Sequence, residues 1–160
     1  MKFLLLTPPL TQLNTPYPAT TVLKGFLESH GHTVAQADLG IELILKIFSR
    51  DCLAEIFSLP IPKESYRNKG VRRVYAEKER YIGCVDAVIR FLQGKDNTLA
   101  PRIANHTLLP EGPRFDSLAD MEWAFGTSGT DDKARYLATL FVEDIADYIR
   151  QTSSPYFDLI

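Results

Sequence analysis

Cysteine and histidine are scarce in this chain, and their scarcity narrows the chemistry open to it. Two cysteines, Cys52 and Cys84, are too few for a disulfide-rich secreted domain, and each lies in an apolar, helix-like pattern. We therefore expect two buried structural thiols, no disulfide and a reducing compartment. His30 and His32 flank Gly31 without a third ligand at suitable spacing, and His106 has no evident partner, so we predict no metal site.

Long apolar runs and a charge excess are also missing. The first apolar run, residues 3–6, ends at Pro8 and Pro9, far short of a secretory signal or a membrane-spanning helix. The formal net charge of -2 argues against a dedicated binder of nucleic acid or of membrane surfaces. With 45% hydrophobic residues, the chain has enough apolar material for the core of one cytoplasmic domain spanning residues 1–160.

The opening of the chain predicts one strand–helix–strand unit over residues 1–40. Residues 3–6 are typical of a strand buried on both faces of a parallel sheet. A proline-rich surface loop follows, residues 7–18, and then a helix that Thr20 or Thr21 caps and Gly31 ends. A second strand ends at Asp38, so the two strands should form a parallel pair with a helical crossover.

Residues 41–160 are predicted to be mostly helical. Apolar spacing indicates one helical stripe from Gly40 to Pro60, a long helix over residues 65–94, and a helix that begins at Thr130. Ser117 with Asp120 resembles a capping box before a further helix, and residues 101–113 are the one expected hinge. Residues 156–160 (YFDLI) have the pattern of a further strand, so we expect an amino-terminal fragment whose fold is completed by later strands or by a second copy.

No complete catalytic constellation is present, and two other motifs have simpler interpretations. Residues 126–130 (GTSGT) lack both the G-x-S-x-G register and the Gly-Lys-Ser/Thr ending of a phosphate loop, so we predict a capped turn. Residues 63–80 contain seven basic residues against three glutamates, a local excess that could bind nucleic acid or an anionic partner. A solvated helix face with internal ion pairs is the alternative.

The chain resembles a known family in two regions, its opening and the part beyond Gly40. Residues 5–9 (LLTPP) are followed by residues 17–19 (YPA), residues 23–34 (LKGFLESHGHTV) and Asp38. This order is similar to the start of the cobalamin-binding domain that is fused to radical S-adenosylmethionine enzymes. Beyond Gly40 the chain resembles a subgroup with a helical insertion, through residues 40–43 (GIEL), 102–105 (RIAN) and 109–115 (LPEGPRF).

The resemblance implies an α/β, mainly helical fold with a partial Rossmann-like unit of the cobalamin-binding type. It implies that cobalamin is the bound cofactor and that a downstream catalytic domain of the same protein, with its iron–sulfur cluster and S-adenosylmethionine, is the partner. The residues that it assigns to the cofactor are Thr7, Pro8, Pro9, Asn14, Tyr17 and Asp38. Two alternatives stay open at these positions: the prolines end a strand while Tyr17 packs on the helix, and Asp38 caps the helix that follows.

The chain also departs from this family. Its two cysteines cannot form the C-x₃-C-x₂-C cluster motif, and no aspartate has a histidine two positions later, as the D-x-H-x-x-G motif of other cobalamin domains requires. We therefore expect no catalysis by residues 1–160 alone. The alternative from another class is a non-catalytic helical module for interaction or homodimer formation, in which the Rossmann-like start is a relic.

Overall fold

The structure is a computed structural model, and it describes residues 1–9, 18–120 and 129–159. The chain divides into two compact units: Met1–Ile47 together with Leu159, and Phe48–Asp158. The described residues are mainly helical, with one two-stranded parallel sheet. None of their helices is both long enough and apolar enough to cross a membrane.

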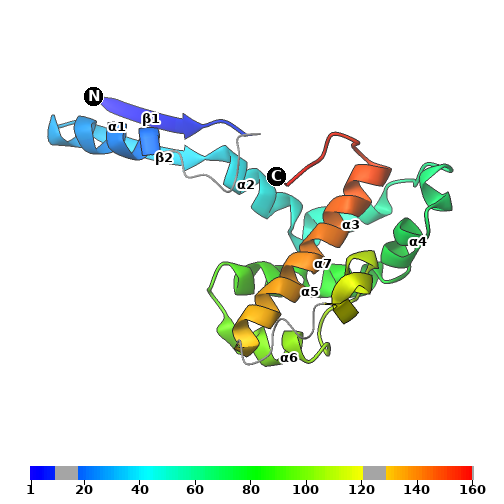
Figure 1. Ribbon diagram of the computed structural model, residues 1–160. Coiled ribbons are helices and arrows are strands. Elements are labelled where there is room, and N and C mark those ends of the chain that lie inside the picture. Colours follow the sequence, from blue (N-terminus) through cyan, green and yellow to red (C-terminus); the bar gives the residue numbers. More distant parts are fainter. Residues whose placement is uncertain (10–17, 121–128, 160) are drawn as a thin grey trace. The chain divides into compact units, whose positions relative to one another are not determined.

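The first unit is a strand–helix–strand segment followed by a short helix (Figure 1). Strand β1 (Lys2–Thr7) pairs in parallel with β2 (Thr33–Asp38), and α1 (Pro18–Ser29) connects them. Helix α2 (Leu39–Ile47) follows β2 directly. Gly31 has φ +77°, the left-handed conformation that the predicted helix stop requires, so the parallel pair and the position of this stop are confirmed.

Two details of this unit differ from the sequence prediction. Helix α1 begins at Pro18, so Thr20 and Thr21 lie in its first turn and do not cap it. Proline is suited to this position because its fixed φ is helical and the missing N–H has no intrahelical partner there. Strand β1 is not buried on both faces, since the side chains of Leu4 and Leu6 are 62% and 47% exposed.

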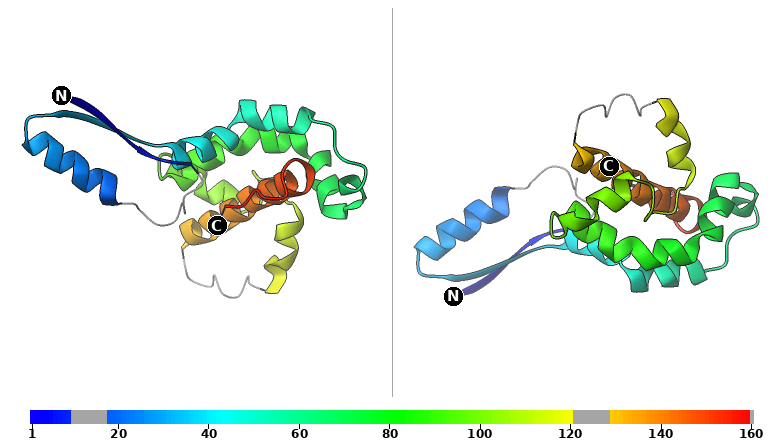
Figure 2. Two further views of the ribbon diagram at one scale, coloured as in Figure 1. Left: turned by 90° about the horizontal axis from the view of Figure 1, so that it is seen from above. Right: turned by 90° about the horizontal axis from the view of Figure 1, so that it is seen from below.

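The second unit consists of helices and contains no strand among its described residues. In chain order the elements are α3 (Arg50–Ser58), η1 (Ser65–Arg67), α4 (Lys69–Ala76), α5 (Lys78–Leu92), η2 (Asn97–Leu99), α6 (Ala100–Ala104), η3 (Pro113–Asp120) and α7 (Thr130–Thr152). Helix α7 is central, because α4, α5, α6 and η3 all pack against it (Figure 2). Its predicted start at Thr130 is confirmed.

Several helices are shorter than their apolar stripes predict. The stripe from Gly40 to Pro60 is divided at Ser49, whose side-chain oxygen accepts a hydrogen bond from Cys52 N and begins α3. The predicted helix over residues 65–94 is likewise divided, because Asn68 caps α4 and Glu77 separates α4 from α5. Ser49 and Asn68 thus each begin a new helix within an apolar stripe that is continuous in the sequence.

Three further predictions in this unit are wrong. Ser117 lies inside η3, where its hydroxyl donates to Arg114 O, so it is not an N-cap. The expected hinge at residues 101–113 lies within the helical unit, and the boundary between units is at Ile47 and Phe48. Residues 156–159 do not form a strand. The predicted turn at residues 126–130 falls largely outside the described residues.

Aromatic side chains fill the core of the helical unit. Tyr81 stacks on Phe141 with ring centroids 5.0 Å apart, and Phe57 lies 4.8 Å from Tyr148. The two ends of the unit also meet, since the rings of Phe48 and Phe157 are 6.5 Å apart. Arg150 fixes the second of these ends by donating hydrogen bonds to Phe157 O and to the Asp158 carboxylate.

Candidate functional site

The carboxyl edge of the sheet brings two of the predicted cofactor residues together. Thr7 and Asp38 are partners in the strand register, so they end β1 and β2 side by side. Thr7 is buried, whereas Pro8 and Pro9 are exposed and end the strand because proline has no N–H to give to a ladder. In open α/β sheets, ligands bind outside this carboxyl edge.

Asp38 has a defined structural role at this edge. Its Oδ1 atom accepts a hydrogen bond of 3.0 Å from Ile41 N in the first turn of α2, which confirms the capping interpretation. A carboxylate has two oxygens, so this bond leaves further acceptor capacity on the side chain. Capping and contact with a ligand are therefore compatible at this position.

The remaining predicted cofactor residues belong to the loop between β1 and α1. Asn14 and Tyr17 lie outside the described residues. Helix α1 runs back along the sheet between two parallel strands, so its amino end at Pro18 lies toward the carboxyl edge. Backbone N–H groups at a helix amino end favour anionic or carbonyl groups of a ligand.

The histidines of this unit lie at the other end of the sheet. His32 precedes β2, and its ring lies 5.3 Å from that of Phe3 near the start of β1. His30 follows α1, with Nδ1 2.8 Å from Phe26 O. The carboxyl edge therefore has no imidazole from this unit. Over the described residues, no group of three or more histidine, cysteine, aspartate or glutamate side chains could hold a metal ion.

The helical unit contains a buried carboxyl group that the sequence reasoning missed. Asp144 on α7 is only 1% exposed, and its carboxylate accepts hydrogen bonds from the backbone N–H groups of Gly112 and Arg114. The Tyr81 hydroxyl lies 3.4 Å away. Burial raises the pKa of Asp144 from 3.8 to about 6. The pKa of Tyr81 is also raised, first by its own burial and then by the neighbouring Asp144 carboxylate.

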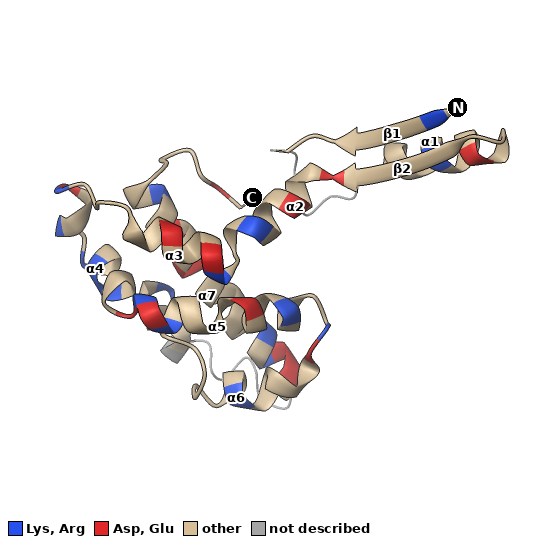
Figure 3. Ribbon diagram, turned by 180° about the vertical axis from the view of Figure 1, so that it is seen from behind, with Lys and Arg blue, Asp and Glu red and all other residues tan. Residues whose placement is uncertain are grey.

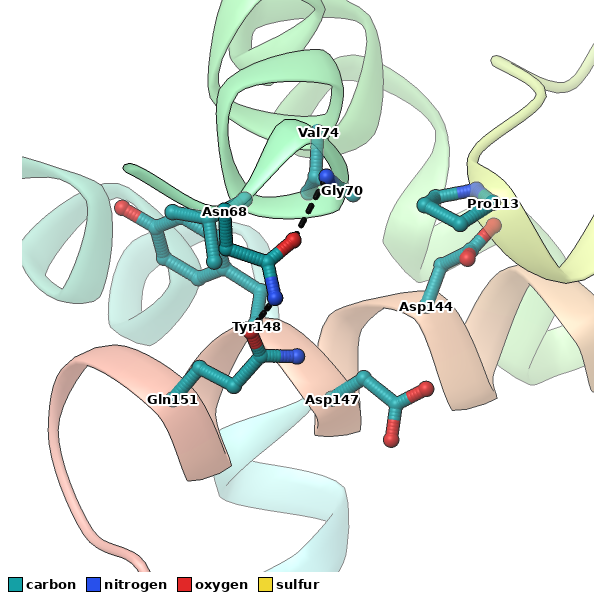
Figure 4. A pocket seen from close by; sticks show the side chains of 9 residues that line it. Asn68, Gly70, Val74, Pro113, Asp144, Asp147, Tyr148 and Gln151 are labelled. Carbon is teal, nitrogen blue, oxygen red and sulfur yellow. Dashed lines mark hydrogen bonds between the residues drawn. The ribbon is translucent and has the colours of Figure 1, made fainter. Parts of the chain in front are cut away.

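Asp144 also lines a cavity of about 260 Å³ between α4, α7 and the start of η3 (Figure 4). Its polar lining groups bind one another. Asn68 donates to Gln151 at 2.6 Å and accepts from Gly70 N, while Asp147 forms ion pairs with Arg114 and Arg150. In Figure 4 the Asp147 carboxylate points away from Asp144. The arrangement anchors η1 and the Gly112–Arg114 turn on α7. Among the described residues, the Tyr148 hydroxyl is the one buried polar group of this lining without a hydrogen-bond partner.

His106 does have a partner, contrary to the sequence interpretation. Its Nδ1 atom lies 2.6 Å from Glu111 Oε1. His106 has φ +56° and follows α6 in a left-handed cap, with hydrogen bonds from His106 N to Ile103 O and from Thr107 N to Arg102 O. The strained backbone is thus explained by the helix end.

The thiols are free, as expected from their number. Cys84 is buried, and burial raises its pKa to about 12, so it is an unreactive structural thiol. Cys52 is half-buried, which makes the expectation of two buried thiols correct for Cys84 only. Among the described residues, neither cysteine belongs to a group of side chains that could hold a metal ion.

One signal in the sequence could have revealed Asp144. The apolar stripe of α7 passes through Phe141, Ile145 and Tyr148, and Asp144 occupies the same face three residues after Phe141. An acidic residue within an apolar stripe requires hydrogen-bond donors, and here the turn after Glu111 provides them.

Comparison of the chain with family models, with curated proteins and with solved structures finds no match.

Proposed function

We propose that this chain supplies the first strand–helix–strand segment of a Rossmann-like, cobalamin-binding domain in a radical S-adenosylmethionine protein. The observation that carries the proposal is the parallel pair of β1 and β2, with a helical crossover and a polar carboxyl edge. A two-stranded parallel sheet is seldom stable alone, because parallel sheets are normally covered by helices on both faces. The segment therefore works as part of a larger sheet.

The exposed face of the sheet supports this proposal. In the register, Leu4 pairs with Ala35 and Leu6 with Ala37, so beyond the first pair, Lys2 with Thr33, this face of the sheet is apolar. Leu4, Leu6 and Ala35 are exposed. Further elements of a complete domain would cover this face, since leaving it in water forfeits about 25 cal/mol for each Å² of apolar area.

The residues at the carboxyl edge suit contact with a corrin ring without a histidine ligand. The Thr7 hydroxyl, the remaining Asp38 acceptor and the amino end of α1 offer hydrogen-bonding groups for amides, hydroxyls or a phosphate. Bound cobalamin would supply the cobalt chemistry, and this chain would hold and orient the ring. Catalysis and the iron–sulfur cluster belong to a downstream part of the same protein.

A cobalamin titration of the protein encoded by the complete gene tests this proposal. Added hydroxocobalamin should shift its visible spectrum on binding, and Thr7→Val should weaken binding about tenfold, because the valine cannot donate or accept a hydrogen bond. Asp38→Asn should weaken it less, since its amide oxygen still caps α2. Asp51→Asn, an exposed change in α3, is the matched control. Absence of a spectral shift at saturating cobalamin would refute the proposal.

A second candidate function is that of an interaction module, favoured by the surface of α1. Helix α1 has no buried residue, and Val22, Leu23 and Phe26 are 67%, 49% and 58% exposed. Three large apolar side chains on one exposed helix are the kind of surface that a partner covers. A second copy of this chain is one such partner.

Sedimentation velocity of the 160-residue chain over a range of concentrations tests the module. A homodimer that uses α1 should dissociate at lower concentration when Phe26→Glu is introduced, because the carboxylate would be desolvated at the interface. Tyr156→Glu places the same charge at a 94% exposed aromatic in the helical unit and should leave the dimer intact. A chain that stays monomeric throughout contradicts this function.

A further inference from the structure

The seven basic residues between Lys63 and Arg80 divide into two groups in the structure. Three serve the fold: Arg73 pairs with Asp116 at 2.7 Å, Arg80 pairs with Glu77 at 2.7 Å, and Lys78 lies over the Tyr75 ring. The internal ion pairs of the alternative interpretation therefore exist, but they account for only part of the charge. The other four are exposed and have no hydrogen bond or ion pair from their side chains to the described residues: Lys63, Arg67, Lys69 and Arg72.

These four residues form what we call the basic face. On α4, Lys69 and Arg72 lie opposite Val71 and Val74, whose side chains are buried. Lys63 and Arg67 come from the segment just before α4. Figure 3 shows the Lys and Arg segments following one another from this segment along α4. A helix with one apolar side in the core thus presents its basic side to the solvent.

Two hydrogen bonds tether the segment before α4 to α7, which matters for binding. The Ser65 hydroxyl donates to Gln151 O at 2.5 Å, and the Asn68 side chain donates to Gln151 Oε1 at 2.6 Å. Between these two anchors lie Tyr66, which is 49% exposed, and Arg67. A segment whose backbone is already anchored loses less conformational entropy on binding, so the backbone of this pair is positioned for a partner.

The chemistry of the surface selects one kind of partner. Cations without a partner in the described part of the chain, beside an exposed aromatic ring, fit a segment that alternates carboxylates with apolar side chains. A long phosphate backbone fits less well, because the whole chain has a net charge of -2 and a sequence pI near 5.9, which repels an extended polyanion beyond the contact. We propose that the basic face, with Tyr66 at its edge, is a docking surface for an acidic, apolar-containing segment of a protein.

Fluorescence anisotropy of the 160-residue chain with a short labelled peptide of repeated Glu-Glu-Leu tests this surface. The Lys69→Glu/Arg72→Glu double variant should weaken binding at least about tenfold, because two attractive contacts become repulsive. The control double variant Lys95→Glu/Arg102→Glu makes the same charge change on exposed residues elsewhere in the helical unit and should change affinity less than about threefold. Tyr66→Ala should weaken binding several-fold without changing its salt dependence.

The proposal would be overturned if the peptide did not bind near 0.15 M salt, or if the two double variants lost affinity for it equally. It would also be overturned if a deoxythymidine oligonucleotide of the same charge bound more tightly than the peptide and the Lys69→Glu/Arg72→Glu variant abolished that binding. The last result would assign the surface to nucleic acid. Thermal melts of all variants should coincide with that of the unaltered chain, since the replaced side chains have no described partners. If the glutamate variant melts early, Lys69→Gln/Arg72→Gln provides the same comparison without charge reversal.

Discussion

Gly112→Ala is expected to lower the free energy of unfolding of the helical unit by about 3 kcal/mol. A Cβ atom at Gly112 would lie 2.7 Å from Asp144 Oδ1 and closer still to Cγ and Oδ2, so the turn and α7 would have to separate. The separation would break the hydrogen bonds from Gly112 N and Arg114 N to the buried carboxylate. Chemical denaturation followed by circular dichroism measures the loss.

Gly83→Ala is the matched control for this substitution. Gly83 lies within α5, and a Cβ atom there has nothing within 4 Å. Because alanine favours the helix over glycine, this change should stabilise the unit by about 1 kcal/mol. Opposite signs for the two substitutions are expected, and a Gly112→Ala variant as stable as the unaltered chain would contradict the close packing of the turn on Asp144.

The stability of the helical unit is expected to fall as the pH rises from about 4 to about 7, through Asp144. Burial raises the pKa of its carboxyl group from 3.8 to about 6, so the folded state binds this proton more tightly than the unfolded state does. The stabilisation is complete below the unfolded pKa and is lost as the pH passes the folded pKa. At about 1.4 kcal/mol per pKa unit, the difference amounts to about 3 kcal/mol.

Asp144→Asn isolates this effect. Asparagine fills nearly the same volume but does not titrate, so the variant should lose the dependence on pH that Asp144 contributes. Arg73 and Tyr81 interact with Asp144, but the pKa of each is raised further above this range, so neither titrates between pH 4 and 7 in either protein. Denaturation at a series of pH values gives the two curves. Parallel curves between pH 4 and 7 would show that Asp144 titrates as an exposed aspartate does.

The elements of the first unit could be predicted because their signals are local. Apolar residues 3–6, the glycine at position 31 and Asp38 define strand, helix end and strand end within short windows. The prediction that β1 is buried on both faces was wrong, because an apolar run forms a fully buried strand only where other elements cover both faces of the sheet. Leu4 and Leu6 have no such cover in the described residues.

The helical unit was harder to predict because its decisive contacts are distant in sequence. Asn68 and Ser49 act as caps within continuous apolar stripes, so periodicity alone merged neighbouring helices. The Asp144 cluster joins residues from α5, α7 and the turn at Gly112, and only the packed structure brings them together. Thr7 and Asp38, by contrast, could be placed together from the sequence, because the ends of parallel neighbouring strands share one edge.

The meeting of Phe48 and Phe157 has a consequence for how the chain could be re-engineered. The first unit ends at Ile47 and includes Leu159 again, so residues 48–158 are a continuous insertion in it. The first and last parts of this insertion are adjacent, because Phe48 and Phe157 are in contact. Segments with neighbouring ends can be inserted into or removed from a host with little strain. The helical unit is therefore an exchangeable cassette, whose two junctions with the rest of the chain lie at one place.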